Sequence, residues 1–347
     1  MNIEEIKRKV ASDEYSFLRD NPHLGNNIIM LCLGGSHAYG TNVETSDLDV
    51  RGCALNSKAE ILARENFEQV VNRETDTTIY SFNKLIDLLL KANPNVLECL
   101  GLKQEHYLYL SPIGQELLDN ADMFLSKKVI QSFGGYATAQ LRRLDNKSAR
   151  SLEQAEKEAH ILNSVKNATV DFKNKFFEYP EDAIKLYIDD AVNDEYDKEI
   201  FMDVNLTHYP LRDYKSMWSA LNNVVKDYAK LEQTGRNREA IRYDKLGKHM
   251  CHLVRLYFMC FDILEHGKIV TYREAEHDFL MDIRNGKYLD DNNQPISEFF
   301  EIVDELEKRL EYDKIHTELP EKPDYNRIKE FTMSVNERIV KDEIDIA

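Results

Sequence analysis

The sequence has few cysteines, no long apolar run and fewer basic than acidic residues. Its five cysteines form no Cys-x-x-Cys pair and lie mostly in apolar stretches, so we predict buried free thiols instead of zinc sites or disulfides. No run of about 18 apolar residues occurs, so we expect no membrane-spanning helix. The segment Met1–Glu5 lacks a basic stretch followed by an apolar one, so we expect no signal peptide and a cytoplasmic protein.

The excess of acidic over basic residues argues against one class of function. Lys and Arg number 45 against 62 Asp and Glu, which gives a net charge of −17. Broad, sequence-independent binding of nucleic acid needs a basic surface, so this class is disfavoured, although a local basic patch is compatible with the balance. Hydrophobic residues make up 42% of the 347 residues, which is typical of a globular chain long enough for two domains.

The first third of the sequence alternates between strand and helix patterns. Short apolar or β-branched runs predict strands at Ile28–Leu33, Asp47–Leu55, Glu68–Val71 and Thr75–Ser81. Between and after them, Ser36–Gly40 and Phe82–Leu90 have the spacing of short helices. Strands interleaved with helices predict an α/β or α+β fold for this part.

Helical periodicity dominates after about Leu118. It is found in Val129–Leu144, Leu152–Phe177, Tyr214–Leu231, Ile241–Leu264 and, more weakly, in Phe299–Leu310 and Tyr325–Val340. The acidic segment Asp189–Asp203 and the segment Asp290–Pro295 are predicted to be exposed loops. The second part is therefore predicted to be mainly helical.

The clearest chemical signal is a Gly-Gly-Ser turn, Gly34–Ser36, after the first apolar run, followed after ten intervening residues by Asp47 and Asp49. In a strand, Asp47 and Asp49 would point to the same side. Neighbouring carboxylates repel each other, and a divalent metal such as Mg²⁺ relieves this while binding phosphate oxygens. Glycines let backbone N–H groups approach a phosphate closely. Surface acids are the alternative, but the turn upstream favours a site for a nucleoside triphosphate and metal.

A third carboxylate on a neighbouring strand would complete a site for metal-assisted phosphoryl transfer. Asp76 is the best candidate because it opens the next strong strand pattern, and Glu74 is the fallback. A plain acid at the edge of a strand is the alternative for Asp76.

One predicted helix carries a row of cationic and imidazole groups. Lys248, His252 and Arg255 stand at i, i+4 and i+7, so they share a helix face. Such a row could bind triphosphate or an RNA phosphate. A solvated face, or pairing with the many carboxylates, is the alternative.

Three further side chains have more than one interpretation. Tyr39 and Tyr80 could stack on a base or pack in the core. Arg284, which precedes Asn285-Gly286, could cap a helix end, form a salt bridge or contact a ligand.

The motif Gly35-Ser36 followed by Asp47-Leu48-Asp49 resembles the signature of the DNA polymerase β-like nucleotidyltransferase superfamily. The longer form, Gly-Ser-His-Ala-Tyr-Gly-Thr at 35–41 and Ser-Asp-Leu-Asp-Val-Arg-Gly at 46–52, is similar to the branch named RNA repair pathway DNA polymerase β family, which are predicted nucleotidyltransferases. Later stretches similar to this branch include Asp76–Tyr80, Asn93–Glu98, Gly135–Ala137, Tyr243-Asp244, Lys248, His252, Arg255-Leu256, Ile283–Gly286 and Leu319–Asp324. The acidic segment Asp189–Asp203 departs from the pattern and resembles an insertion.

The resemblance implies an α+β fold, with a small mixed-sheet nucleotidyltransferase domain at 1–120 and a mainly helical domain at 121–347 closing over the active-site cleft. Asp47, Asp49 and Asp76 would be catalytic and hold Mg²⁺ or Mn²⁺. The expected nucleotide-binding residues are Gly35, Ser36, Tyr39, Lys248, His252 and Arg255. The reaction would move a nucleoside monophosphate from a nucleoside triphosphate onto an acceptor hydroxyl or phosphate, with an RNA end (tRNA included) as the expected acceptor, and release pyrophosphate.

Other functions stay open at this point. A protein-modifying enzyme that attaches a nucleoside monophosphate to a hydroxyl side chain is the nearest alternative, and an antibiotic-modifying nucleotidyltransferase fits the later motifs poorly. A catalytically idle nucleotide-binding module is the alternative from another class. The acidic balance of the chain favours a compact acceptor over a long nucleic acid.

Overall fold

The computed structural model describes residues 1–133 apart from Arg64 and Asn66, residues 184–190 and 198–205, isolated positions up to Asn222, and residues 246–290 and 294–343. The chain divides into two compact units. The first contains Met1–Leu141, Gly247–Tyr288 and Ile296–Ala347, and the second contains Arg142–Leu246 and Leu289–Pro295. The predicted helix at Leu152–Phe177, and most of those at Val129–Leu144 and Tyr214–Leu231, lie outside the described residues.

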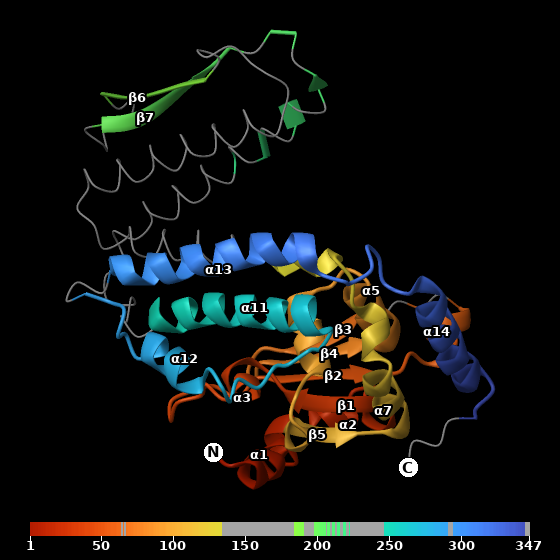
Figure 1. Ribbon diagram of the computed structural model, residues 1–347. Coiled ribbons are helices and arrows are strands. Elements are labelled where there is room, and N and C mark those ends of the chain that lie inside the picture. The colour runs from red at the N-terminus through yellow and green to blue at the C-terminus, as the bar shows by residue number, and fades with distance from the viewer. Residues whose placement is uncertain are drawn as a thin grey trace. The chain divides into compact units, whose positions relative to one another are not determined.

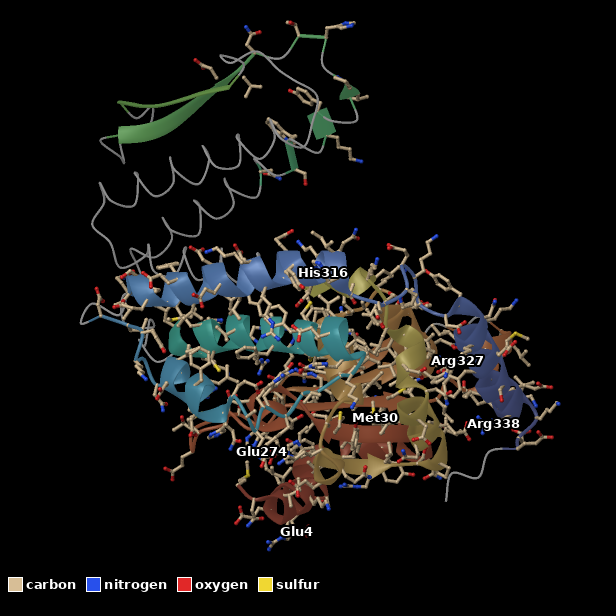
Figure 2. All side chains as sticks on the ribbon, viewed as in Figure 1. Glu4, Met30, Glu274, His316, Arg327 and Arg338 are labelled. Atoms are coloured by element: carbon tan, nitrogen blue, oxygen red, sulfur yellow. The ribbon has the colours of Figure 1, made fainter. Side chains whose placement is uncertain are left out.

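A five-stranded mixed sheet forms the centre of the first unit (Figure 1). Its strands are β1 (Ile28–Leu33), β2 (Val50–Ala54), β3 (Gln69–Asn72), β4 (Thr77–Ser81) and β5 (Tyr107–Leu110), in the order β3-β4-β2-β1-β5. Only β2 and β4 are parallel among the pairs of this sheet. Every residue of β1 is buried, and Met30 lies at its centre (Figure 2), as expected for a strand that is an unbroken apolar run. The predicted α+β fold with a mixed sheet is confirmed.

Helices surround this sheet and make up most of the described C-terminal part. The N-terminal helices are α1 (Ile3–Val10), α2 (Phe17–Asp20), α3 (Gly35–Tyr39), α4 (Lys58–Leu62), α5 (Phe82–Leu89), α6 (Pro94–Leu97) and α7 (Pro112–Asp119). The C-terminal helices are α11 (Leu246–His266), α12 (His277–Arg284), α13 (Ser297–His316) and α14 (Tyr325–Val340). Within the described ranges, no helix has the length and apolar character needed to cross a membrane.

The C-terminal helices complete the first unit by packing on its N-terminal part. Arg338 of α14 (Figure 2) forms two hydrogen bonds with the Glu116 carboxylate of α7. Their lengths are 2.9 and 2.7 Å. In the segment after α11, the Arg273 amide donates to the Tyr39 carbonyl at 3.2 Å and the Thr271 amide donates to the Gly101 carbonyl at 2.9 Å. These bonds join residues on either side of residue 120, where the sequence predicts a domain boundary; that boundary stays a prediction.

The second unit contains a hairpin where the sequence suggests a loop. Strands β6 (Ile184–Asp190) and β7 (Lys198–Val204) pair antiparallel, with Asp189 opposite Glu199 and Leu186 opposite Met202. The prediction of an exposed loop for Asp189–Asp203 is therefore wrong at both ends of this segment. Apolar residues recur at every second position of these stretches, and this strand pattern outweighs the acidic residues between them.

Candidate active site

The Gly-Gly-Ser turn between β1 and α3 is built around the carboxylate of Asp49. The Gly34 amide donates to the Asp49 carbonyl at 2.9 Å. Gly35 has a φ of +53°, and a Cβ there would stand 1.9 Å from Asp49 Oδ2. Glycine is thus required at position 35 for two reasons: the backbone adopts a left-handed conformation, and Asp49 lies where a Cβ would be. Ser36 is buried in the first turn of α3.

Asp49 and Asp76 lie at the same edge of the sheet. Asp49 directly precedes β2 and Asp76 directly precedes β4, and these strands are parallel neighbours. The Val50 amide donates to the Asp76 carbonyl at 3.3 Å, while Asp76 adopts a left-handed φ of +45°. Parallel pairing therefore brings together two carboxylates that stand 27 positions apart in the chain.

These two carboxylates interact strongly. Burial, followed by the hydrogen bond and the negative charge of Asp76, raises the pKa of Asp49 to about 6, while Arg51 and Lys248 act in the opposite direction. The side chain of Asp49 is 17% exposed and that of Asp76 is 61% exposed. A pair of carboxylates that repel each other at an accessible edge can bind a proton or a divalent cation.

Arg51 was not expected from the sequence to belong to the site, yet it contacts both carboxylates. Its guanidinium lies 3.4 Å from Asp49 Oδ1 and 3.6 Å from Asp76 Oδ1. The available signal was its spacing of two residues from Asp49, which is the period of a strand face.

Lys248 joins the site from the N-terminal end of α11. It is exposed, and its positive charge acts on Asp49. From the set of predicted site residues the structure thus brings together Gly35, Asp49 and Asp76, and the charge of Lys248 acts on Asp49. His252, one turn further along α11, is half-buried.

Asp47 lies in the loop before β2. The predicted strand at Asp47–Leu55 begins only at Val50, so the expectation that Asp47 and Asp49 share a strand face is wrong. A tight loop precedes the strand because the Ser46 hydroxyl accepts from the Val43 amide at 2.9 Å and from Arg284 Nη2 at 3.0 Å. Asp47 is exposed on this loop.

The donor set fits one divalent cation at the Asp49–Asp76 pair, because carboxylate oxygens are the ligands that Mg²⁺ prefers. No group of three or more His, Cys, Asp or Glu side chains with metal-binding geometry occurs in the part of the chain that the structure describes. The remaining predicted ligand, Asp47, stays a prediction.

Tyr39 and Arg255 are packed in the core. The Tyr39 hydroxyl donates to Glu98 Oε2 at 2.7 Å, and the Arg255 guanidinium lies 3.5 Å from the centre of the Tyr39 ring. Both side chains and Glu98 are buried. Burial raises the pKa of Glu98, against the effect of Arg255 and of the hydrogen bond from Tyr39. Of the alternatives left open by the sequence, packing in the core describes Tyr39, whose hydroxyl also donates to a carboxylate, and Arg255 packs on the Tyr39 ring.

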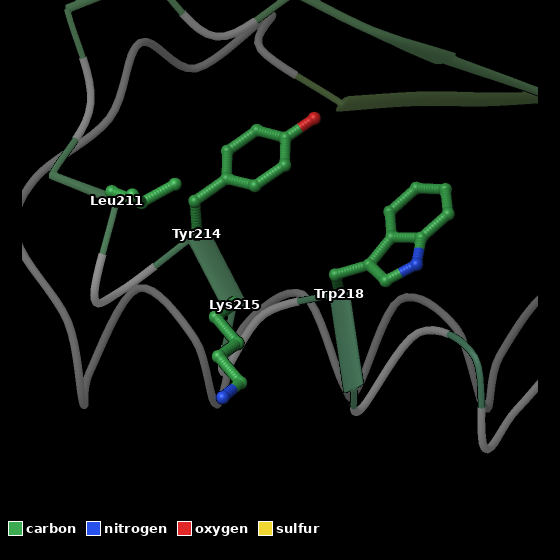
Figure 3. A pocket seen from close by; sticks show the side chains of 4 residues that line it. All are labelled: Leu211, Tyr214, Lys215 and Trp218. Atoms are coloured by element: carbon green, nitrogen blue, oxygen red, sulfur yellow. The ribbon is translucent and has the colours of Figure 1, made fainter.

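A separate cavity of about 630 Å³ lies in the second unit (Figure 3). Its described lining residues are Leu211, Tyr214, Lys215 and Trp218. None of the predicted site residues is among them.

A mixed sheet that carries a glycine turn and two carboxylates at one edge is the arrangement implied by the resemblance to polymerase β-like nucleotidyltransferases. Residues 4–169 match the model of the RNA repair pathway DNA polymerase beta family. The resemblance stated from the motifs is thereby confirmed over these residues, and the family name points to a polymerase β-like nucleotidyltransferase. No curated protein matches the chain.

Proposed function

We propose that this chain is a metal-dependent nucleotidyltransferase that moves a nucleoside monophosphate from a nucleoside triphosphate onto an acceptor hydroxyl or phosphate and releases pyrophosphate. An RNA end is the acceptor that the family name favours. The observation that carries the proposal is the carboxylate pair, Asp49 and Asp76, held against the glycine turn at Gly35.

Each part of the site has a role in this reaction. Asp49 and Asp76 would hold Mg²⁺ or Mn²⁺, which supplies charge neutralisation at the phosphate oxygens. Gly35 lets the turn approach Asp49 closely, because a Cβ at this position would stand 1.9 Å from Asp49 Oδ2. Gly35 and Ser36 would contact the triphosphate from this turn. Lys248 adds a positive charge that can pair with a phosphate. We keep Asp47 as a candidate third ligand, and Asp76 as a candidate acceptor of the proton that leaves the attacking hydroxyl.

The test is a labelling reaction. Purified protein, Mg²⁺ or Mn²⁺ and each α-phosphate-labelled nucleoside triphosphate are mixed with total cell extract, and each product is divided between ribonuclease and protease. We expect label that ribonuclease removes. Label that only protease removes would replace RNA by a protein acceptor, and the absence of label with every nucleotide, while nucleotide still binds, would favour an idle nucleotide-binding module.

Two substitutions locate the activity at this site. Asp49→Asn removes a charge from the carboxylate pair and is expected to lower the transfer rate at least about 1000-fold, which corresponds to several kcal/mol of lost charge stabilisation. Asp278→Asn is the matched control, because Asp278 on α12 has a fully exposed side chain. Equal rates for the two variants would show that Asp49 does not act in the transfer.

A further inference from the structure

Arg51 contacts both carboxylates of the candidate site and the glycine turn beside them. Arg51 Nη1 donates to the Asp76 carbonyl at 2.8 Å and to the Val50 carbonyl at 3.1 Å, while its guanidinium lies beside both carboxylates. Its aliphatic stem lies against the glycine turn, because a Cβ on Gly34 would stand 3.0 Å from Arg51 Cγ. The side chain is only 20% exposed. One side chain therefore touches the turn, the start of β2 and the start of β4.

These contacts explain the unusual backbone of Asp76. A left-handed conformation is uncommon for residues other than glycine, although Asp tolerates it better than most. The Asp76 carbonyl accepts from both Arg51 Nη1 and the Val50 amide, so two donors on the neighbouring strand hold the residue in this conformation. The planar guanidinium can make several of these bonds at once because its five N–H donors are fixed in one fork.

We propose that Arg51 is a positioning residue for the transfer reaction. Its guanidinium sets the separation of the Asp49 and Asp76 carboxylates and keeps Asp76 in its left-handed turn, so that the pair meets the divalent cation in one geometry. This inference rests on the proposed function of the site. Arg51 acts through the two aspartates and need not touch the nucleotide.

Positioning and simple charge balance predict different outcomes. Arg51→Gln keeps a planar polar group but loses the charge and most of the fork. We expect its kcat to fall at least about 100-fold, the cost typical of a misplacement of about 1 Å at a reacting centre, with the KM for nucleoside triphosphate changed less than about threefold. Arg51→Lys keeps the charge without the fork, so only partial rescue is expected. Full rescue by lysine would overturn positioning in favour of charge balance.

The matched control is Arg338→Gln. Arg338 is similarly shielded, with 28% of its side chain exposed, and makes a two-bond contact to Glu116, so it reports the effect of losing an arginine pair elsewhere in the same unit. Its kcat is expected to equal that of the unsubstituted chain. If Arg51→Gln has the same kcat as this control while the separate variant Asp49→Asn is inactive, the positioning role is overturned and the proposed function stands.

A measurement without turnover keeps the inference testable even if no transfer is detected. Amide hydrogen exchange of Val50, whose N–H donates to the Asp76 carbonyl, should accelerate at least tenfold in Arg51→Gln. The amide of Leu31 in the buried strand β1 should keep its protection, which shows that the sheet is intact. Unchanged exchange at Val50 would mean that Arg51 does not hold the Asp76 turn, whatever the reaction of the site.

Discussion

Replacing Gly35 by alanine tests the site at its most crowded point. The new Cβ would stand 1.9 Å from Asp49 Oδ2, 2.8 Å from Asp49 Cγ and 3.4 Å from Asp49 Cβ. The first of these distances is about half of an ordinary van der Waals contact. Because Asp49 is anchored through its carbonyl to the Gly34 amide, its backbone cannot withdraw easily, and the carboxylate has to rotate away.

The expected magnitudes separate activity from stability. Restoring ordinary contact moves the Asp49 carboxylate by more than about 1 Å, a displacement that costs roughly 100-fold in rate at a reacting centre. A left-handed φ adds about 1–2 kcal/mol of strain for a residue with a Cβ. Gly35→Ala should therefore lose at least about 100-fold in transfer rate while the folded population stays dominant.

Gly267→Ala is the matched control. Gly267 also has a left-handed φ, of +61°, but a Cβ there would meet nothing within 4 Å. In urea denaturation Gly267→Ala should lose only the free energy of its left-handed φ, and Gly35→Ala should lose at least as much because its Cβ also displaces Asp49. Only Gly35→Ala should lose transfer. Full activity of Gly35→Ala, or equal loss of activity in both variants, would refute the assignment of Asp49 and Gly35 to one site.

Two further predictions concern buried carboxylates. Asp313 of α13 is 6% exposed, and burial followed by the Glu265 carboxylate raises its pKa from 3.8 to about 6. Because the pKa is higher in the folded state, Asp313 destabilises the fold as the pH rises from about 4 to about 6. Asp313→Asn should therefore raise the free energy of unfolding by at most about 3 kcal/mol at pH 7 and change it little at pH 4. Equal effects at both pH values in urea unfolding would contradict this. Tyr39→Phe removes the hydroxyl that donates to the buried Glu98 carboxylate. It should lower the free energy of unfolding by about 2 kcal/mol without changing the KM for nucleoside triphosphate. A raised KM at unchanged stability would instead make Tyr39 a nucleotide contact.

The apolar strand and the glycine turn were predictable because their signals are local. An unbroken apolar run over Ile28–Leu33 has few structural alternatives, and Gly35 permits a conformation that most residues avoid. Phe82–Leu90 was predictable for the same reason, since α5 spans Phe82–Leu89 and the Ser81 side chain caps it by accepting from the Lys84 amide.

The exact composition of the site was less predictable because it depends on distant contacts. Strand β2 begins at Val50 instead of Asp47, after a loop that Arg284 binds from 238 residues away. Asp76 was expected within a strand, but it has a left-handed φ and lies in the turn before β4. The alternation of apolar and polar residues does not predict this conformation. Arg255 stands in a row with Lys248 along α11, yet only the structure shows that its guanidinium covers Tyr39.

The division of the first unit into three chain segments has a consequence for its synthesis. The sheet strands are all made before residue 111, whereas α11, which covers Tyr39, begins at Leu246. A ribosome adding about 5–20 residues per second needs roughly 5–20 s to make the intervening residues of the second unit. During that interval Tyr39 lacks two of its contacts with α11, the Arg255 guanidinium over its ring and Met259 beside its hydroxyl. The core around Tyr39 is therefore completed only after the second unit has been made.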